Sequence, residues 1–213
     1  RMVYRDRFTL GEGASAFLNS PALYPALVGV QTNLYKNFIE RSWGLLSPVG
    51  VAGLLHPEGV FDDPKGGKFR EQYYRRLRGH YQFKNELKLF DDIGNRVAFS
   101  INVFDRTGDT VRFDSVFNLF APGTITRCQQ HDRQADPIPG MKDDQEQWEL
   151  RGHCQRLITI TEAELALFTR LFEKPDTLSL QARLPQVHSR EILDVLRKFA
   201  DAPQRLGDLE GEY

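Results

Sequence analysis

The chain has 213 residues, of which 40% are hydrophobic and 27% are charged, so it can bury one sizeable core or one core with a smaller subdomain. Its net charge of −1 at pH 7 argues against a module that binds nucleic acid through bulk positive charge. No stretch is long and apolar enough to predict a membrane-spanning helix or a signal peptide, and we therefore expect a cytoplasmic protein.

The N-terminal part of the chain, residues 1–31, is predicted to be an irregular lead-in, because its glycines and prolines interrupt any sustained period. Apolar side chains then recur at helical spacing, which predicts an amphipathic helix over residues 32–46. The short apolar run 51–55 does not alternate. It predicts a strand that is buried on both faces, as parallel sheets require.

The middle of the chain is predicted to begin with a loop, 56–67, and a helix over residues 68–78 that Gly79 ends. Residues 81–89 and 97–104 alternate as strands do, and turn-forming residues separate them, which predicts an antiparallel hairpin. The order helix, strand, helix, strand, strand predicts an α/β fold. Specifically, it predicts the closing half of a doubly wound sheet that ends in an antiparallel hairpin.

This α/β domain is expected to span residues 32–107, and residues 108–213 are expected to form a small α+β extension. The elements expected in the extension are one or two strands within 110–120, a loop over 129–147, a short strand within 148–160, a helix opened by a capping box at Thr161 and Glu164, and a last helix capped by Ser189. The polar end, 201–213, is expected to fray.

Two neighbouring stretches carry a family resemblance: residues 29–41 read GVQTNLYKNFIER, and residues 45–59 read LLSPVGVAGLLHPEG. Similar segments follow as DDPKGG at 62–67, NELKLF at 85–90 and FSINV at 99–103. Over residues 28–105 the chain resembles the large restriction-modification type N6-adenine-specific DNA methyltransferases. In these proteins the methylase and target-recognition regions share one polypeptide.

The resemblance implies a parent protein that binds S-adenosylmethionine as its cofactor and double-stranded DNA as its partner. Members of the family bind the cofactor through a Gly-rich turn and hold the target amine with an Asn-Pro-Pro-aromatic motif, and neither motif occurs here. By the family's order both motifs, and the catalytic residues with them, are expected upstream of Arg1. The chain therefore fits an excised piece of a larger polypeptide, the C-terminal half of a methylase domain leading toward a target-recognition region, which is inactive and binds no cofactor by itself.

A target-base pocket is expected at the carboxyl edge of the predicted sheet, where doubly wound folds place their ligands. His56, Pro57 and Glu58 follow the first predicted strand directly. A methyltransferase that acts on a base must also extrude it and stack it on an aromatic face. Phe90 and Phe99, on either side of the hairpin turn, are the candidates for that face, and the alternative for each is a place in the core.

A local run of basic residues lies between Lys65 and Lys88, although the whole chain is nearly neutral. Contacts with the DNA backbone are expected from the basic residues Lys65, Lys68, Arg70, Arg75 and Arg76. The alternative is an ordinary solvated helix face, because charge clusters are common on helices.

Two other classes of function stay open at this point. A Mg²⁺-dependent restriction-type nuclease would combine Asp62 or Asp63 with Glu86 and Lys88, since two carboxylates can hold the metal ion and a lysine can steer the attacking water. A non-catalytic domain that contacts DNA or another protein is the second alternative.

The two cysteines are too few for a disulfide framework. Cys128, His131, His153 and Cys154 have residue types that suit zinc, but neighbouring side chains on a strand point to opposite faces, so His153 and Cys154 are not expected to share one ion. We therefore expect two plain thiols and no bound metal.

Overall fold

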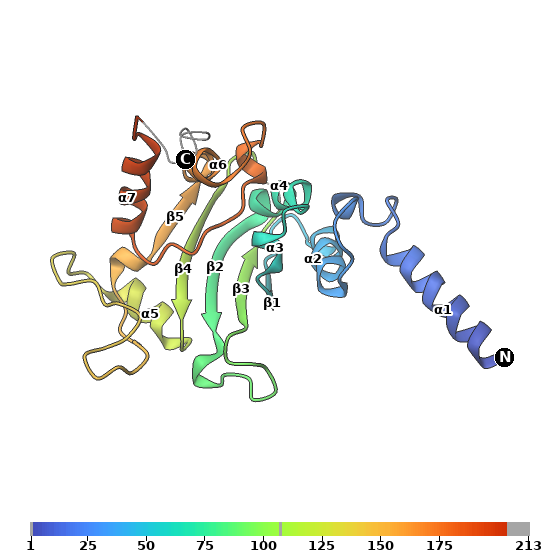
Figure 1. Cartoon of the computed structure of the whole chain (residues 1–213), viewed down its shortest axis with the longest axis horizontal. Helices are drawn as coiled ribbons and strands as arrows, with labels where there is room; N and C mark the ends of the chain where they lie inside the picture. The colour runs from blue at the N-terminus through green and yellow to red at the C-terminus, as the bar shows by residue number, and fades with distance from the viewer. Residues whose placement is uncertain (1, 107, 204–213) are drawn as a thin grey trace, which may run out of the picture.

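The computed structural model describes residues 2–106 and 108–203, which form a mixed α/β fold with seven helices and one five-stranded sheet (Figure 1). The strands are β1 (Ala52–Pro57), β2 (Leu77–Lys84), β3 (Ala98–Phe104), β4 (Arg112–Leu119) and β5 (Ile158–Thr161), and they lie in the order β1-β3-β2-β4-β5. The helices are α1 (Met2–Leu18), α2 (Leu34–Leu45), α3 (Gly59–Asp62), α4 (Gly67–Arg76), α5 (Gly123–Gln130), α6 (Glu162–Phe172) and α7 (Arg190–Ala200). No helix in the described part of the chain is both long and apolar enough to cross a membrane.

The sheet is built around a reversed strand. β3 runs antiparallel to both β1 and β2, so β1 and β2 run in the same direction on either side of it. α4 lies between β1 and β2 in sequence, and β2 then pairs parallel with β4. The carboxyl ends of β1 and β2 consequently lie at the same edge of the sheet, and β4 and β5 extend the same sheet beyond residue 107.

Several predicted elements are confirmed. Helix α2, the antiparallel pairing of β2 with β3, and helix α7 are present as predicted. Strand β2 nevertheless ends at Lys84, and Asn85–Leu87, predicted as part of the strand, form a 3-10 helix. Ser189 occupies the N-cap position of α7 without a side-chain capping hydrogen bond. Helix α6 begins with the predicted capping box, in which the Thr161 hydroxyl accepts a hydrogen bond from the backbone and the Glu164 carboxylate accepts one from the amide of Thr161. Such reciprocal caps are local chemistry, so the sequence is enough to locate them.

Strand β1 was predicted to be buried on both faces, and this prediction is wrong. Among the described residues it pairs with β3 alone and forms an edge of the sheet, and its residues alternate between more and less exposed. Leu55 is 52% exposed and Val51, just before the strand, is 68% exposed. The apolar run therefore leaves one strand edge and several apolar side chains uncovered.

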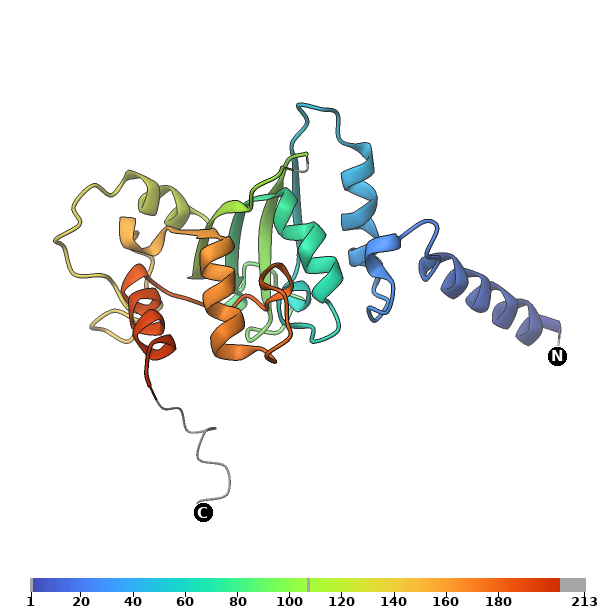
Figure 2. The same ribbon diagram turned by 90° about the horizontal axis from the view of Figure 1, so that it is seen from above.

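The predicted irregular lead-in is also wrong over most of its length. Residues Met2–Leu18 form helix α1, which projects away from the sheet and the other helices (Figures 1 and 2). Gly11 and Gly13 were expected to break the chain, yet both lie inside this helix with open space around them. Two glycines lower helix propensity by about 1 kcal/mol each, which a 17-residue segment can still accommodate.

Two expectations concern the ends of the sequence. Arg1 and residues 204–213 lie outside the described residues. The lead-in prediction is thus contradicted over Met2–Leu18, agrees with the turns and the short 3-10 helix of residues 19–31, and is untested at Arg1. Fraying beyond residue 203 and catalytic residues upstream of Arg1 both stay predictions.

The helix that precedes β2 ends earlier than predicted. α4 stops at Arg76 and the chain enters β2 at Leu77 without a loop, so Gly79 belongs to the strand, next to a register shift in its pairing with β3. A glycine inside a strand commonly marks such an irregularity. Helix α5 was not predicted at all, because its two buried residues, Thr124 and Cys128, give too weak a helical pattern.

Each face of the sheet carries its own apolar cluster. α4 and α6 contribute to the larger cluster, which includes Phe104 and Phe113 of the sheet. On the other face Cys128 of α5 packs with Val116 and Leu119. The helices on the first face also cover a row of polar side chains at the centre of the sheet.

Candidate functional site

A row of buried polar side chains crosses the first face of the sheet. The row contains His56 of β1, Ser100 and Asn102 of β3, His80 of β2 and Ser115 of β4, all of which are buried. The strand register brings them together, because His56 lies opposite Ser100 and His80 lies opposite both Asn102 and Ser115. Buried polar groups need partners, so this row requires a hydrogen-bond network.

His56 is held by three partners. Its Nδ1 lies 2.8 Å from the carbonyl oxygen of Pro57, and since a carbonyl only accepts, Nδ1 carries the proton. Its Nε2 therefore accepts, from the Asn102 amide at 3.0 Å and the Tyr73 hydroxyl at 2.8 Å. Burial lowers the pKa of His56, which keeps the ring neutral near pH 7.

The second half of the network joins a carboxylate to an imidazole. The Glu58 carboxylate lies 3.4 Å from Nε2 of His80, whose Nδ1 lies 2.6 Å from the Ser115 hydroxyl. Burial tends to raise the pKa of Glu58, but the neighbouring His80 and a hydrogen bond with Ser100 hold it below its usual value. Glu58 thus stays ionised, and it is the member of this network nearest to solvent.

Two atoms of the same sheet region have no hydrogen-bond partner within the described chain. They are the side-chain oxygen Oδ1 of Asn102 and the side-chain nitrogen Nε2 of Gln82, and both are buried. Chemically, a carboxylate beside two imidazoles can hold and orient a proton donor. The network is nevertheless covered by protein, because Phe61 and Phe117 pack on the His80 ring at 4.5 and 5.2 Å.

The residues predicted to form the target-base pocket do not line one pocket. His56 and Glu58 do lie together, but Phe99 belongs to the apolar cluster on the opposite face, where it stacks on Phe83 at 5.6 Å. Phe90 packs on Phe99 at 5.1 Å. Strand alternation causes the separation, because adjacent positions of β3 point to opposite faces.

Pro57 is exposed and lies opposite Phe99 in the β1–β3 pairing. The alternative of a core position is therefore correct for Phe99, which is buried, while Phe90 is only partly covered. Of the five predicted pocket residues, Glu58 is the one that combines partial exposure with a charge at the carboxyl end of β1.

The predicted DNA-contact residues differ in how accessible their charged groups are. Lys65 and Lys68 are exposed. Arg70 is buried, and its guanidinium donates to backbone carbonyls, so it is not available to a phosphate and this expectation is corrected. Arg75 lies 3.8 Å from Glu71. Arg76 is half-buried, with its guanidinium 4.7 Å from the centre of the Trp43 ring.

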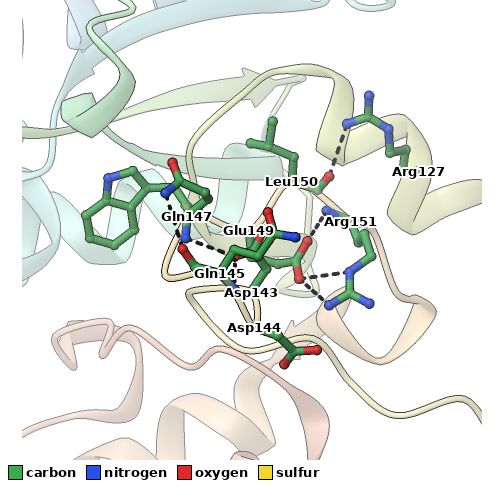
Figure 3. A pocket seen from close by; sticks show the side chains of 9 residues that line it. Arg127, Asp143, Asp144, Gln145, Gln147, Glu149, Leu150 and Arg151 are labelled. Carbon is green, nitrogen blue, oxygen red and sulfur yellow. Dashed lines mark hydrogen bonds and ion pairs between the residues drawn. The ribbon is translucent and has the colours of Figure 1, made fainter.

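A surface cleft of about 540 Å³ lies outside the predicted sites, and it is lined by Arg127 and by residues within 143–151, a segment that begins in the predicted loop. Figure 3 shows how its charges are paired: the Arg151 guanidinium donates to the Glu149 carboxylate, and Arg127 donates to the carbonyl of Leu150. The Asp143 carboxylate accepts two backbone amides of its own turn. All these pairings are made within the protein, so the folding of the loop is enough to explain the cleft.

Within the described residues, two carboxylates of the nuclease hypothesis are held by other side chains. The Asp63 carboxylate accepts a 2.8 Å hydrogen bond from Lys36, and the Glu86 carboxylate accepts one from Asn95. Within residues 2–106 and 108–203, the group of three or more side chains close enough to hold a metal ion consists of His131, His153 and Cys154. That group contains none of the acidic residues on which the nuclease hypothesis depends.

The buried network predicts a pH dependence of stability. The pKa of His56 is lower in the folded state than its unfolded value of about 6.5, so protons bind the unfolded chain first as the pH falls. The stability contribution is fully present above about pH 6.5 and is lost on acidification toward the folded-state pKa.

We expect His56→Gln to lower the free energy of unfolding at pH 7 and to flatten its decline between about pH 6.5 and 5. Urea unfolding of both proteins across this range measures the difference. Burial also lowers the pKa of His188. Because His188 is present in both proteins, its contribution to the pH dependence of stability is the same in both. Identical pH slopes for the two proteins would contradict the prediction.

No protein-family model matches the chain, and neither does any curated protein. Among solved structures, the type IIG restriction endonuclease BpuSI is 15% identical over 67% of this chain and 16% of its own, with a TM-score of 0.41. The M protein of the type I restriction enzyme EcoKI is 12% identical over 87% of this chain and 49% of its own, with a TM-score of 0.42.

A third solved structure, of a type I restriction-modification system, is 13% identical over 79% of this chain and 38% of its own, with a TM-score of 0.37. The chain thus spans less than half the length of the solved chains that it matches here. These neighbours are restriction-modification proteins, but TM-scores below 0.5 do not establish a common fold. The likeness by itself therefore assigns no function.

Proposed function

We propose that this chain is part of an S-adenosylmethionine-dependent DNA adenine N6-methyltransferase of a restriction-modification or phage-defence system, and that it forms the C-terminal part of the methylase sheet. The observation that carries the proposal is the sheet topology. Two strands of the same direction, β1 and β2, are joined through α4 and closed by the antiparallel β3. This supports the closing half of an α/β sheet that the order of the elements in the sequence predicts.

The uncovered edge of β1 supports the same proposal. Its backbone edge is unpaired within the described chain, and Leu55 and Val51 are exposed there. The neighbouring helix α2 also presents apolar side chains to solvent: Leu34, Phe38 and Leu45. An open edge flanked by apolar side chains is a site where another strand adds readily. We assign this edge to the preceding strands of the methylase sheet.

The cofactor site and the catalytic residues are proposed to lie in that preceding part of the parent protein, upstream of Arg1. The described chain offers no glycine-rich turn after a strand, and the pair Gly11 and Gly13 lies within helix α1. Glu58, at the carboxyl end of β1, lies at the edge where such folds bind their ligands. Its role in the proposal is to face the target base, with His56 and His80 positioning it.

The proposal predicts complementation between two pieces of the parent. Neither this chain nor the preceding methylase segment should methylate adenine alone, whereas the two produced together should. A substitution on the β1 edge, Leu55→Lys, should leave the melting temperature of this chain unchanged but weaken complementation. Burying a leucine contributes about 1.5–3 kcal/mol, so the loss should be about tenfold or more.

Mass spectrometry of nucleosides from plasmid DNA measures the methylation. The matched control is Leu178→Lys, since Leu178 is also an exposed leucine but lies in a different part of the chain. Two results would contradict the proposal: micromolar binding of S-adenosylmethionine by this chain alone, or full methylation by the preceding segment without it.

A further inference from the structure

Three side chains from two separate segments meet beside helix α5. His131 follows the end of α5, while His153 and Cys154 open the short 3-10 helix Cys154–Arg156 (η3). One potential ligand atom from each of the three lies within 4.8 Å of the others. The two imidazole rings are 4.3 Å apart between centroids. Two histidines and a cysteine are the ligand types that zinc prefers.

Gly152 explains how the two segments come so close. A Cβ atom on Gly152 would lie 2.3 Å from the carbonyl carbon of Arg127 and 2.3 Å from the backbone nitrogen of Cys128. The backbone of residue 152 therefore rests directly on the backbone of α5. This close approach is possible only for glycine, and it holds His153 and Cys154 beside the end of the helix.

The objection raised from the sequence does not apply to the folded chain. It assumed that His153 and Cys154 lie on a strand and point to opposite faces. In the structure His153 is the N-cap of η3 and Cys154 is its first residue, so the chain turns between them. The Sγ atom of Cys154 consequently lies 4.0 Å from Nδ1 of His153.

Asp136 orients both imidazole rings. Nε2 of His153 lies 3.0 Å from the carbonyl oxygen of Asp136, and because a carbonyl only accepts, Nε2 carries the proton. Nε2 of His131 lies 3.3 Å from the carboxylate of the same residue. Both rings thus direct Nδ1 toward Cys154. Histidines that bind metals are typically held in this way, with the second ring nitrogen donating to a carbonyl or carboxylate.

We propose that His131, His153 and Cys154 bind one zinc ion through two Nδ1 atoms and a thiolate, with the fourth position open to the adjoining cleft. That cleft has a volume of about 500 Å³ and is lined in part by His131, His153, Pro137 and Pro139. A water molecule or a small ligand can therefore occupy the fourth position, as in zinc sites that retain an exchangeable ligand.

Binding requires small, definable changes. Zinc lies about 2.0 Å from imidazole nitrogen and about 2.3 Å from thiolate sulfur, so the ligand atoms must approach to about 3.5 Å. The ion also replaces two hydrogen bonds: the one that Nδ1 of His153 accepts from the amide of Gln155, and the one that Nδ1 of His131 accepts from the amide of Cys154. The Cys154 thiol releases its proton to solvent. Cys128 stays outside the set, because burial raises the pKa of its thiol and it does not belong to the group.

Metal titration of the whole chain tests the site. The protein is first freed of metal with a chelator, and Co²⁺ is then added as a spectroscopic substitute for Zn²⁺, followed by Zn²⁺ in competition. We expect one equivalent per chain, with the intense absorption of a cobalt–thiolate bond and a rise in melting temperature with Zn²⁺.

Substitutions distinguish the proposed zinc ligands from the residues around them. Cys154→Ser should abolish the thiolate absorption and the Zn²⁺-dependent rise in melting temperature, and His131→Ala should weaken binding by about tenfold or more. Asp136→Asn should weaken it by about 10–100-fold, as expected for a residue that orients ligands. Cys128→Ser is the matched control and should keep both signals.

Two outcomes would overturn the proposal: less than one tenth of an equivalent bound at concentrations about tenfold above the protein, or a thiolate absorption that survives in Cys154→Ser. Each variant's metal-free melting temperature shows whether it is folded. Cys154 is partly exposed and Asp136 lies in a loop, so conservative changes there can be tested even where replacing the buried His153 impairs folding.

Discussion

Replacing Arg70 with methionine is expected to lower the free energy of unfolding by about 3 kcal/mol, because it removes the donor to the carbonyl groups of Gln181 and Val60. The carbonyl of Asp63 keeps a second donor, the amide of Gly66. The Arg70 guanidinium donates twice to the carbonyl of Gln181, at 3.0 and 2.9 Å, and also to those of Val60 and Asp63. One side chain thereby connects three segments, one of which is about 110 residues away in sequence.

The sign of this effect depends on which partners remain. Replacing a whole buried ion pair by apolar residues can be neutral or stabilising. Arg70 instead donates to backbone carbonyls, which stay in place when the side chain is removed, and each unpaired group costs about 1–3 kcal/mol. Burial lowers the pKa of Arg70, in line with the cost of keeping its charge inside, yet guanidinium remains protonated in proteins.

Urea unfolding measures the change, and two further variants sharpen it. Lys68→Met, on the same helix but exposed, should change stability by less than about 0.5 kcal/mol. Arg70→Lys should not restore stability, because an ammonium group lacks the planar fork that spans these carbonyls. An Arg70→Met protein as stable as the original would show that the carbonyls find other partners.

Gly152→Ala is expected to destabilise the protein by about 2–3 kcal/mol through overpacking. The added methyl group would lie 2.3 Å from two backbone atoms of α5, and backbone cannot move aside as a flexible side chain can. Either η3 or α5 must shift, which also separates Cys154 from His131. The effect is steric, because Gly152 does not adopt the left-handed conformation that would disfavour alanine by itself.

Gly140→Ala is the matched control for this prediction. A Cβ atom added at Gly140 would have the carbonyl oxygen of Lys142 as its nearest neighbour, at 3.7 Å, which is an ordinary van der Waals distance. We expect its stability to be unchanged or slightly increased, since alanine has less conformational entropy to lose. Equal melting temperatures for the two variants would indicate that the contact between Gly152 and α5 is not maintained in solution.

Features that depend on neighbouring residues could be predicted from the sequence. The amphipathic helix α2, the capping box that opens α6, and the β2–β3 hairpin all follow from periodicity or from side chains a few residues apart. The position of Glu58 at the carboxyl end of the first strand follows in the same way, because it depends on where that strand ends. These rules involve residues close in sequence and do not depend on tertiary contacts.

Only the tertiary structure decided which distant segments meet. The edge position of β1, the burial of Arg70 beneath Gln181, and the separation of Phe99 from His56 depend on pairing between segments far apart in the chain. Local periodicity carries no record of such pairing, because a strand's partner and register are set by the burial of a whole sheet face. For the same reason, the sequence did not predict that His131 and Cys154 lie close together. Their proximity depends on the packing of the Gly152 backbone against α5.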